Sequence, residues 1–357
     1  MTATPTKPSE LDATTRQLLD LMQDHYPMVE RPYQALGEQL GLTEAEVLER
    51  LGQARSAGVV RQICAIFDTK ALGYSSALVA MRIDPERLKR AVRILNAHPG
   101  VSHNYRRNHE FNVWFTVAMP PGEDFDVVIQ KLHEMTGAES TRPMPTLYLF
   151  KIAVTLDISG MRDLDARGTP EYTEERRVEA ATHAITDLDI AYIRATQGDM
   201  PDVPEPFAAL GAPLGMTGAE VIAYGQRMQE HGHLRRFAGI INHRQAGFRA
   251  NGMAVWNVPE DKIQEFGVYV AGYRGVSHCY QRPTYPDWPY SVFSMLHNAK
   301  VSGVEEAAAA IARDTGVSDF RILYSTTEYK KIRLPYFTPE YDQWESLCTA
   351  AAEEPAS

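Results

Sequence analysis

A histidine, a tyrosine and an arginine occur twice in this chain with identical spacing. The segment 100–107 has the sequence Gly-Val-Ser-His-Asn-Tyr-Arg-Arg, and the segment 275–282 has Gly-Val-Ser-His-Cys-Tyr-Gln-Arg, so six of the eight residues are the same. The offset between the two segments is 175 residues (275 minus 100). An imidazole that titrates near neutral pH, together with a phenol and a guanidinium, suits a surface that binds a polyanion and moves a proton.

A β-strand would place the three side chains of each segment on one face, because alternate residues of a strand share a face. The sequence therefore predicts two equivalent rows: His103, Tyr105 and Arg107 in the first segment, and His278, Tyr280 and Arg282 in the second. His109 would come next on the same side of the first row. A half-exposed strand with a polar outer face would explain either row alone. Because the row is repeated, we favour a functional role.

The composition narrows the class of protein. A chain of 357 residues with 44% hydrophobic and 23% charged residues is typical of a globular protein with more than one domain. The net charge of −10 argues against non-specific nucleic-acid binding, so an anionic ligand would need a local basic patch. The three cysteines, Cys64, Cys279 and Cys348, lack metal-ligand spacing. Without a signal-peptide core or an apolar run of membrane-spanning length, we expect a cytoplasmic protein.

The N-terminal part predicts a winged helix-turn-helix domain over residues 11–70. A helix is expected from Leu11 with Asp12 as its N-cap, and a second helix is expected to end at Gly41. Thr43 and Glu46 form a capping box at the start of a third helix, and a β wing follows to Phe67. The third helix is acidic, whereas a helix that reads DNA usually exposes Arg, Lys, Asn or Gln. We therefore expect no DNA binding.

Residues 71–157 predict a ferredoxin-like domain. Strand and helix signals alternate in the order βαββαβ, with the motif 100–107 at the second strand and residues 146–156 as the last strand. Such a sheet carries its helices on one face and leaves the other face for a partner sheet or a ligand. The first repeated segment would therefore lie on a sheet that has one face available.

The whole arrangement is then repeated. A linker is expected at 158–186, a second and degenerate helix-turn-helix domain at 187–246, and a second ferredoxin-like domain with a C-terminal extension at 247–347. Prolines crowd the second helix-turn-helix domain, and Gly225 is expected to interrupt its last helix. The last strand of the second sheet is expected at 321–332, and an aromatic tail should pack across a domain before the chain loosens from Ala350. The fold class is α+β, a tandem duplication of a two-domain unit.

The residues around the two rows are similar to those of a known family. A helix-turn-helix domain followed by a βαββαβ domain resembles the Lrp/AsnC regulators, a likeness that says little about function. The run from His103 to Phe115 resembles one subunit type of the sirohaem decarboxylases. The run from His278 to Pro283, with Trp288-Pro289-Tyr290 and Met295-Leu296-His297, resembles the other subunit type. The resemblance implies a natural fusion of the D- and L-type subunits of haem d1 biosynthesis.

This resemblance implies an activity and a set of site residues. The family removes carbon dioxide from the acetates at C12 and C18 of sirohaem to give 12,18-didecarboxysirohaem, for haem d1 or the alternative haem route. We expect His103 and His278 to donate protons and Arg107 and Arg282 to clamp carboxylates, since the Arg fork binds both oxygens. The other candidates for substrate binding are Tyr105, Tyr280, Arg106, His109, His297, Arg61 and Arg235. We expect no metal site and no cofactor beyond the iron-tetrapyrrole substrate. The alternative role for one of the four histidines is to ligate the substrate iron.

Two other functions stay open from the sequence. A ligand-sensing transcription regulator of the Lrp/AsnC type would need basic recognition helices, and a tetrapyrrole-binding protein without catalysis would use the same Arg and His residues. Each histidine taken alone is as well explained by a structural role, and the two halves need not be equally active. We expect the two halves to pair within one chain. Homo-oligomers and association with other haem d1 biosynthesis enzymes stay open.

Overall fold

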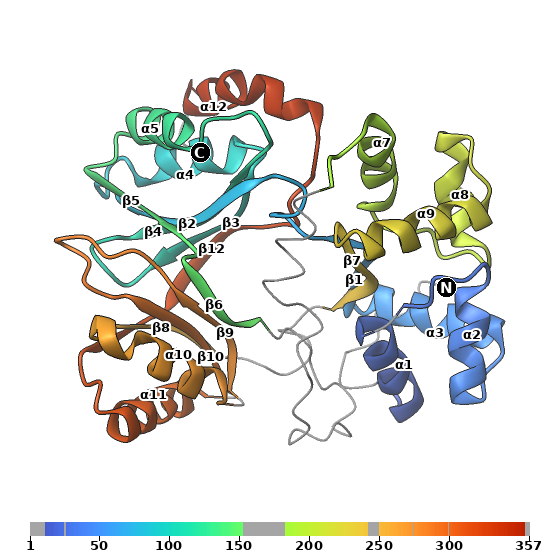
Figure 1. The fold of residues 1–357 in the computed structure, drawn as a ribbon, viewed down its shortest axis with the longest axis horizontal. Helices are drawn as coiled ribbons and strands as arrows, with labels where there is room; N and C mark the ends of the chain where they lie inside the picture. The colour runs from blue at the N-terminus through green and yellow to red at the C-terminus, as the bar shows by residue number, and fades with distance from the viewer. Residues whose placement is uncertain are drawn as a thin grey trace, which may run out of the picture. The chain divides into compact units, whose positions relative to one another are not determined.

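The chain forms two compact units, and each unit combines segments from both halves of the sequence. The computed structural model describes residues 11–24, 26–152, 183–241, 250–273, 275–298 and 300–353, so most of the expected linker at 158–186 lies outside the described residues. The first unit comprises Met1–Gly73 with Thr155–Gly247, and the second comprises Tyr74–Val154 with Phe248–Ser357 (Figure 1). The helix-turn-helix segments therefore belong to the first unit and the ferredoxin-like segments to the second.

The first helix-turn-helix segment folds as its capping residues predict. Its helices are α1 (Ala13–Asp24), α2 (Pro32–Leu40) and α3 (Glu44–Ser56). The Asp12 carboxylate accepts from the main-chain N–H of Thr15 at 2.7 Å, and Thr43 and Glu46 form the expected capping box. Gly41 ends α2 in the left-handed conformation, with φ of 69°, which a residue without Cβ adopts at little cost. The local signals alone account for these helix ends.

The basic side chains of α3 are held in ion pairs. Arg50 lies 2.6 Å from the carboxylate of Asp12, and Arg55 lies 2.8 Å from Asp199 and 2.7 Å from Asp202. Both aspartates that bind Arg55 come from the second half of the chain. The Arg55 pairs join the two helix-turn-helix segments. Both arginines of this otherwise acidic helix therefore have their charges paired with carboxylates of the protein.

The prediction that Gly225 interrupts its helix is wrong. The second segment contains α7 (Asp187–Thr196), α8 (Pro206–Gly211), a short 3-10 turn (Ala212–Leu214) and α9, which runs without a break from Gly218 to Glu230. A Cβ atom at Gly225 would lie 2.5 Å from the hydroxyl oxygen of the buried Tyr192. The glycine therefore allows close packing, which offsets its cost of about 1 kcal/mol in a helix.

The two wing strands pair with each other. β1 (Val60–Phe67) and β7 (Leu234–Ile241) form a two-stranded antiparallel sheet. The sequence predicts a strand at each wing but assigns neither a partner. Pairing satisfies the main-chain groups of both strands and joins the duplicated segments into one unit.

The second unit contains two five-stranded sheets, each with the predicted βαββαβ order. The first half supplies β2 (Ser75–Arg82), α4 (Leu88–Ala97), β3 (Val101–Arg107), β4 (Val113–Met119), α5 (Phe125–Thr136) and β5 (Ser140–Pro145). The second half supplies β8 (Ala250–Trp256), a 3-10 turn (Glu260–Lys262), α10 (Ile263–Ala271), β9 (Val276–Gln281), β10 (Val292–Asn298), α11 (Val301–Thr315) and β11 (Phe320–Leu323). The α+β duplication is confirmed.

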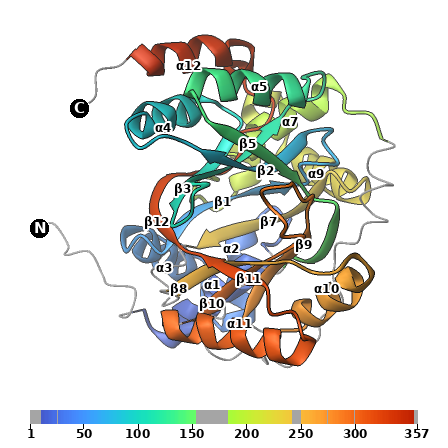
Figure 2. The ribbon, with the colours of Figure 1, turned by 90° about the vertical axis from the view of Figure 1, so that its left-hand side faces the viewer.

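The two sheets exchange strands, which the sequence does not predict. β6 (Tyr148–Ile152) leaves the first half and pairs with β9, while β12 (Ser325–Lys331) leaves the second half and pairs with β3 (Figure 2). The sheet orders are β12-β3-β4-β2-β5 and β11-β8-β10-β9-β6. The expected strand at 146–156 is therefore wrong as a strand of its own sheet, because the chain crosses to the other sheet after β5. The expected strand at 321–332 is confirmed only for residues 321–323 of β11, and the chain then crosses to the other sheet as β12.

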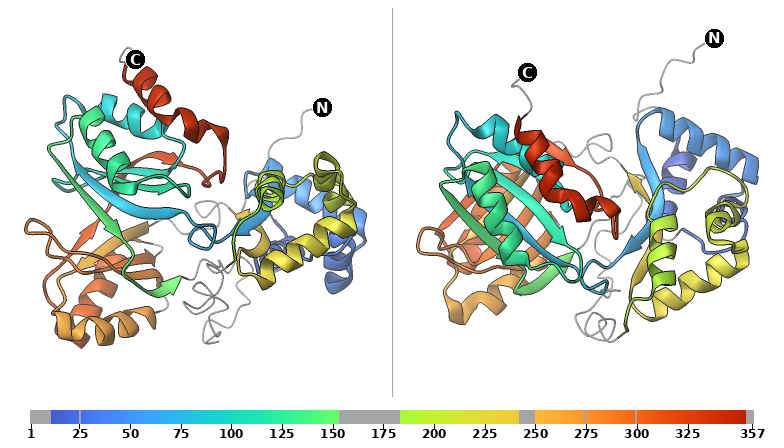
Figure 3. Two further views of the ribbon diagram at one scale, coloured as in Figure 1. Left: turned by 45° about the horizontal axis from the view of Figure 1, so that its top comes forward. Right: turned by 90° about the horizontal axis from the view of Figure 1, so that it is seen from above.

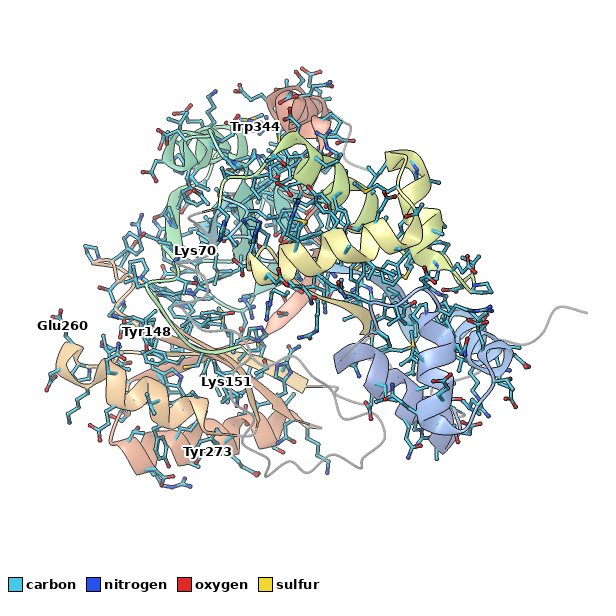
Figure 4. The ribbon with its side chains drawn as sticks, turned by 45° about the vertical axis from the view of Figure 1, so that its right-hand side comes forward. Lys70, Tyr148, Lys151, Glu260, Tyr273 and Trp344 are labelled. Carbon is cyan, nitrogen blue, oxygen red and sulfur yellow. The ribbon has the colours of Figure 1, made fainter. Side chains whose placement is uncertain are left out.

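A lysine of each exchanged strand binds the helix of the domain that receives it. Lys330 Nζ donates to the carbonyls of Asn96 at 2.7 Å and His98 at 3.2 Å, where α4 ends. Lys151 Nζ donates to the carbonyl of Tyr273 at 3.0 Å, after the end of α10 (Figure 4). Burial lowers the pKa of Lys330 to about 8 and also lowers that of Lys151. A cation at the C-terminal end of a helix complements its dipole.

The aromatic tail packs on the first sheet domain, as predicted. A 3-10 turn (Pro339–Gln343) leads into α12 (Trp344–Glu353), which lies against α4 (Figure 3). Trp344 and Cys348 enter the core of that domain, and the Tyr341 hydroxyl donates to the carbonyl of Ala118 at 3.0 Å. The chain stays helical to Glu353, so the expected loosening from Ala350 is wrong for the described residues.

The structure describes the cysteines, the possible metal-binding groups and the apolar helices of the described residues. Cys64, Cys279 and Cys348 are free thiols, and all three are buried. Within the described ranges, no group of three or more His, Cys, Asp and Glu side chains is arranged to hold a metal ion. In the same ranges, no single helix is long and apolar enough to cross a membrane, although a pair bent by 87° (Pro206–Leu214 and Gly218–Glu230) passes by length and composition.

His98 is a buried imidazole beneath α12. It is fully buried, its ring centroid lies 4.8 Å from that of Trp344, and its Nδ1 accepts from the main-chain N–H of Gly100 at 3.0 Å. Burial, followed by the charge of Lys330, lowers its pKa from 6.5 to about 3. The folded protein therefore keeps this imidazole neutral over a pH range in which the unfolded chain takes up a proton.

We predict that the His98→Gln variant loses less stability in acid than the unchanged protein does. Between pH 6.5 and 3 the unfolded chain binds a proton that folded His98 refuses, so the free energy of unfolding falls as pH drops, by about 1.4 kcal/mol per unit. Urea unfolding at pH 7.5 and pH 5.5 measures the difference. The His133→Gln variant, at a half-buried position on α5, is the control. Equal acid sensitivity of His98→Gln and the unchanged protein would contradict the assignment.

Candidate functional site

The two repeated rows face the layer between the sheets. Each lies on the strand next to an exchanged strand: β3 in the first sheet and β9 in the second. Tyr105 pairs in register with Trp114, and Tyr280 pairs with Phe293, so the tyrosines share a face with the apolar layer between the sheets. That layer is formed by Ala80, Phe111, Trp114, Met144, Met253, Val255, Trp288, Tyr290, Phe293 and Leu323.

A β-bulge precedes each histidine. Val101 pairs with Val117 and His103 pairs with Thr116, so Ser102 is an extra residue in β3. The second motif repeats this, because Val276 pairs with Leu296 and His278 pairs with Met295 around Ser277. A bulge re-aims neighbouring side chains.

The bulges bring each serine hydroxyl to the imidazole that follows it. Ser102 Oγ lies 3.0 Å from Nδ1 of His103, and Ser277 Oγ lies 2.8 Å from Nδ1 of His278. Both serines belong to the repeated sequence, but the sequence analysis predicts no role for them. Their identity in both copies was the signal that could have marked them.

Imidazole, phenol and guanidinium follow one another in both motifs with nearly the same geometry. The His103 and Tyr105 ring centroids are 6.2 Å apart at 32°, and those of His278 and Tyr280 are 6.0 Å apart at 29°. The guanidinium carbon of Arg107 lies 5.8 Å from the Tyr105 ring, and that of Arg282 lies 4.9 Å from the Tyr280 ring. The predicted rows therefore exist, and each is a continuous set of contacts.

The two arginines are buried and cross between the sheets. Arg107 is 6% exposed, and its Nη1 donates to the carbonyl of Leu323 on β11 at 2.8 Å. Arg282 is 8% exposed and donates in the same way to the carbonyl of Met144 on β5. Burial lowers the pKa of each to about 10. The structure places both guanidiniums inside the protein, where they join the sheets, and their expected role as carboxylate clamps stays a prediction.

The Nε atom of each guanidinium makes no hydrogen bond to any described residue. The Nε atoms of Arg107 and Arg282 are buried and make no hydrogen bond within the described ranges. Buried charged groups are usually paired, because a buried hydrogen-bond donor that is left without an acceptor costs about 1–3 kcal/mol. These two donors are therefore available to an anionic group that reaches the layer between the sheets.

The two rows lie on opposite flanks of the paired sheets. Arg107 reaches β11, an edge of the second sheet, whereas Arg282 reaches β5, the edge of the first sheet that lies farthest from β12. β9 therefore faces the part of the first sheet that lies near β5. In the same way, β3 faces the part of the second sheet that lies near β11. Within the first sheet β3 and β5 are three strand spacings apart, about 14 Å. The two rows are therefore offset across the layer, although Lys331 pairs in register with His103 and its charge also acts on His297.

The second motif has an additional histidine. Ser277 Oγ lies 2.6 Å from Nε2 of His297, so one hydroxyl joins two imidazoles. The first half has Ala118 at the corresponding position, because the main-chain N–H of Ala118 bonds to Gly100 as that of His297 bonds to Gly275. Burial, and then the charge of Lys331, lowers the pKa of His297. Lys331 pairs in register with His103 across β12 and β3.

The other candidates from the sequence are not members of the rows, although His109 lies against Phe111 and Trp288 of the same apolar layer. His109 follows the end of β3, so strand alternation does not reach it; its Nδ1 accepts from the N–H of Phe111 and its ring lies 5.3 Å from that of Trp288. Burial lowers its pKa. Arg106 is on the opposite face of β3 from His103 and faces α4. Arg61 and Arg235 lie on β1 and β7 of the first unit.

Two family models match most of the chain. The model described as "AsnC-like ligand binding domain" matches residues 71–151 and 245–330. The model described as "Siroheme decarboxylase NirDL-like HTH domain" matches residues 15–61 and 189–235. Each model matches twice, once in each half, in agreement with the duplication.

Known proteins match over the full length and over half of it. A siroheme decarboxylase of Hydrogenobacter thermophilus is 36% identical over 329 residues, 92% of this chain and 96% of that protein. A siroheme decarboxylase beta subunit of Methanosarcina barkeri is 38% identical over 143 residues, 40% of this chain and 94% of that protein. The crystal structure of the siroheme decarboxylase NirDL, in co-complex with an iron-uroporphyrin III analogue, is 32% identical with a TM-score of 0.75, covering 96% of this chain and 100% of that one.

We predict that the Arg107→Ala variant lowers the free energy of unfolding by about 2–4 kcal/mol, because it opens a cavity and leaves the carbonyl of Leu323 unpaired. Arg106→Ala is the matched control: the same change at the exposed neighbour should stay within about 0.5 kcal/mol. Urea unfolding followed by tryptophan fluorescence measures both. Similar losses in the two variants would show that Arg107 does not join the sheets.

Proposed function

This chain belongs to the sirohaem decarboxylase family, and we propose that it removes carbon dioxide from the acetate side chains at C12 and C18 of sirohaem to give 12,18-didecarboxysirohaem. It is a carboxy-lyase. The observation that best supports the assignment of roles is the pair of rows in which a serine hydroxyl holds an imidazole beside a tyrosine and a buried arginine.

The chemistry requires one proton for each carbon dioxide released. When the bond between the acetate methylene and its carboxylate breaks, carbon dioxide leaves and the electron pair stays with the methylene carbon, from which the tetrapyrrole ring delocalises it. A proton then completes the methyl group. Because the substrate takes up the electron pair itself, the reaction needs no separate cofactor in this proposal.

Histidine suits the delivery of that proton. An imidazole has its ordinary pKa near 6.5, so it is both protonated and able to release a proton at neutral pH. In each motif the serine hydroxyl engages Nδ1, and in our proposal the other ring nitrogen, Nε2, gives up the proton. His103 and His278 are the proposed donors, and Ser102 and Ser277 position them.

The second motif is the better equipped of the two. A proton can pass from Nε2 of His297 to the Ser277 hydroxyl and from that hydroxyl to Nδ1 of His278, over contacts of 2.6 Å and 2.8 Å. For this relay His278 starts neutral, with its single proton on Nε2, and gives that proton to the substrate in the same step in which Nδ1 receives one from Ser277. Ala118 offers no such supply in the first half. We infer that the two motifs act at different rates.

Carboxylate binding is proposed for the arginines and tyrosines of the rows. The buried Nε donors of Arg107 and Arg282 favour a carboxylate that enters beside Tyr105 or Tyr280, since a charge-assisted hydrogen bond is stronger in a dry site. For Arg61 and Arg235, which belong to the first unit, substrate binding stays a prediction from the sequence. A protein that only binds the tetrapyrrole would use the same contacts, and only turnover separates the two.

We predict that His278→Gln slows the loss of carbon dioxide more strongly than His103→Gln, by at least about tenfold, because general acid catalysis contributes about 10²–10⁴-fold. Both variants should still bind sirohaem. Anaerobic single turnover followed by mass analysis of the tetrapyrrole measures each loss of carbon dioxide separately. Binding by the unchanged protein without any change of mass would reject the decarboxylase function and favour a carrier.

We predict that Lys331→Gln moves the alkaline limb of the pH–rate profile to higher pH. The ammonium of Lys331 lowers the pKa of His297, so its removal raises that pKa and keeps the imidazole protonated at higher pH. The single-turnover rate from pH 5.5 to 9 measures the limb. Lys300→Gln, an exposed site on the second domain, is the control, and a limb that does not move with Lys331→Gln would exclude His297 as the source of the proton.

A further inference from the structure

A basic groove lies on the helix-covered side of the first sheet. It has a volume of about 600 Å³, within the usual size of small-molecule sites. It lies between α4, β3 and the exchanged strand β12. Its lining is Pro85, Leu88, Lys89, Val92, Arg93, Arg106 and Tyr329.

The lining combines cations with apolar side chains. Lys89, Arg93 and Arg106 supply three positive charges, and none of the described lining residues is a carboxylate. Arg93 Nε also donates to the carbonyl of Ala351 at 3.1 Å. The chain as a whole carries a net charge of −10. A local excess of three cations on an acidic protein attracts a small anion to this place. Leu88, Val92 and Tyr329 provide the apolar surface beside those charges.

The second half of the chain provides an internal comparison. The constant offset of 175 residues relates α4 to α10 and β3 to β9, and the residues of the second half that replace the three cations are uncharged. They are Gln264 for Lys89, Val268 for Arg93 and Gln281 for Arg106. The charges of the groove are thus particular to the first half and do not follow from the fold.

In the second half the ring of Phe150 covers the corresponding part of the helix. Phe150 of β6 holds there the position that Tyr329 of β12 holds in the first half, since both residues precede the lysine that binds the neighbouring helix end. The Phe150 ring covers α10 at Gly267, where a Cβ atom would lie only 2.3 Å from the ring. The first half has Val92 at that position, so Tyr329 cannot settle onto α4 in the same way. The open groove follows from this difference.

We propose that this groove is a second ligand site, for a small amphipathic molecule with two or three carboxylates on a flat apolar body. The carboxylates bind Lys89, Arg93 and Arg106, and the apolar body lies on Leu88, Val92 and Tyr329. Two sources fit this chemistry: a tetrapyrrole of the reaction that binds in addition to the one being processed, or a separate effector. The site does not depend on the proposed function, because it lies on the opposite face of β3 from His103.

An occupant would contact the strand that carries the first motif. Arg106 lies between Tyr105 and Arg107 in β3, and the side chains of these neighbours face the other sheet. A ligand held by Arg106 therefore restrains the main chain of the row without touching the layer between the sheets. This arrangement links the groove to the first motif through a single strand.

We predict that benzenetricarboxylate binds the unchanged protein and that a variant bearing the residues of the second half (Lys89→Gln, Arg93→Val and Arg106→Gln together) binds it at least tenfold more weakly. Isothermal titration measures the affinity, which should fall as salt is raised. The same ring carrying three uncharged amides should not bind. Arg106→Glu, a single exposed change, tests the site if the triple variant folds poorly.

The charge-matched control changes three exposed cations of the second half: Lys262→Gln, Lys300→Gln and Arg313→Gln. This control should bind the probe as the unchanged protein does. Equal affinity of the groove variant and this control would overturn the proposal, as would no binding to the unchanged protein. Sirohaem titration separates the sources: one equivalent fewer in the groove variant assigns the site to a tetrapyrrole, and equal stoichiometry assigns it to a separate effector.

Discussion

The exchange of β6 and β12 is the constraint on which the second unit depends. Each sheet takes one of its five strands from the other half of the chain, so neither half can complete its hydrogen-bonded ladder alone. The exchange also places Lys330 and Lys151 at helix ends of the opposite domain. The buried arginines add a further link, because Arg107 and Arg282 each bind a carbonyl of the other sheet. The geometry of both motifs is therefore set by pairing that spans the whole chain.

Duplication preserved the geometry of the motifs and changed their surroundings. Both histidines follow a bulged serine and lie beside a tyrosine at nearly the same distance. Around this shared frame, the second half gained His297 beside Ser277, whereas the first half has a small apolar residue there. On the outer side the difference is reversed, because the first half has the basic groove and the second half fills the same place with Phe150. In the proposed reaction on two acetates of one substrate, the two motifs can therefore have different roles although their geometry is similar.

Local features of the sequence predicted the elements well, and long-range features were missed. The capping residues Asp12 and Thr43 marked helix starts because their hydrogen bonds are short in sequence. Strand alternation placed His103, Tyr105 and Arg107 correctly on one face. It could not show that β12 would cover the edge of β3, because a strand carries no local mark of its partner. The burial of Arg107 and the continuity of α9 through Gly225 depend on neighbours that are distant in sequence, Leu323 and Tyr192, and only the folded chain brings them together.

The position of β12 near the end of the chain has a consequence for synthesis on the ribosome. The first sheet is complete only when residues 325–331 have emerged, although the strand that they cover, β3, appears more than two hundred residues earlier. Until then one edge of β3 is unpaired. β6 is likewise unpaired until its partner strand β9 has been synthesised. Because both partners belong to one polypeptide, the missing strand arrives at a high effective concentration that does not depend on the abundance of another subunit. Half-length relatives must find their counterpart by diffusion, if they pair in the same way, whereas this chain carries its own.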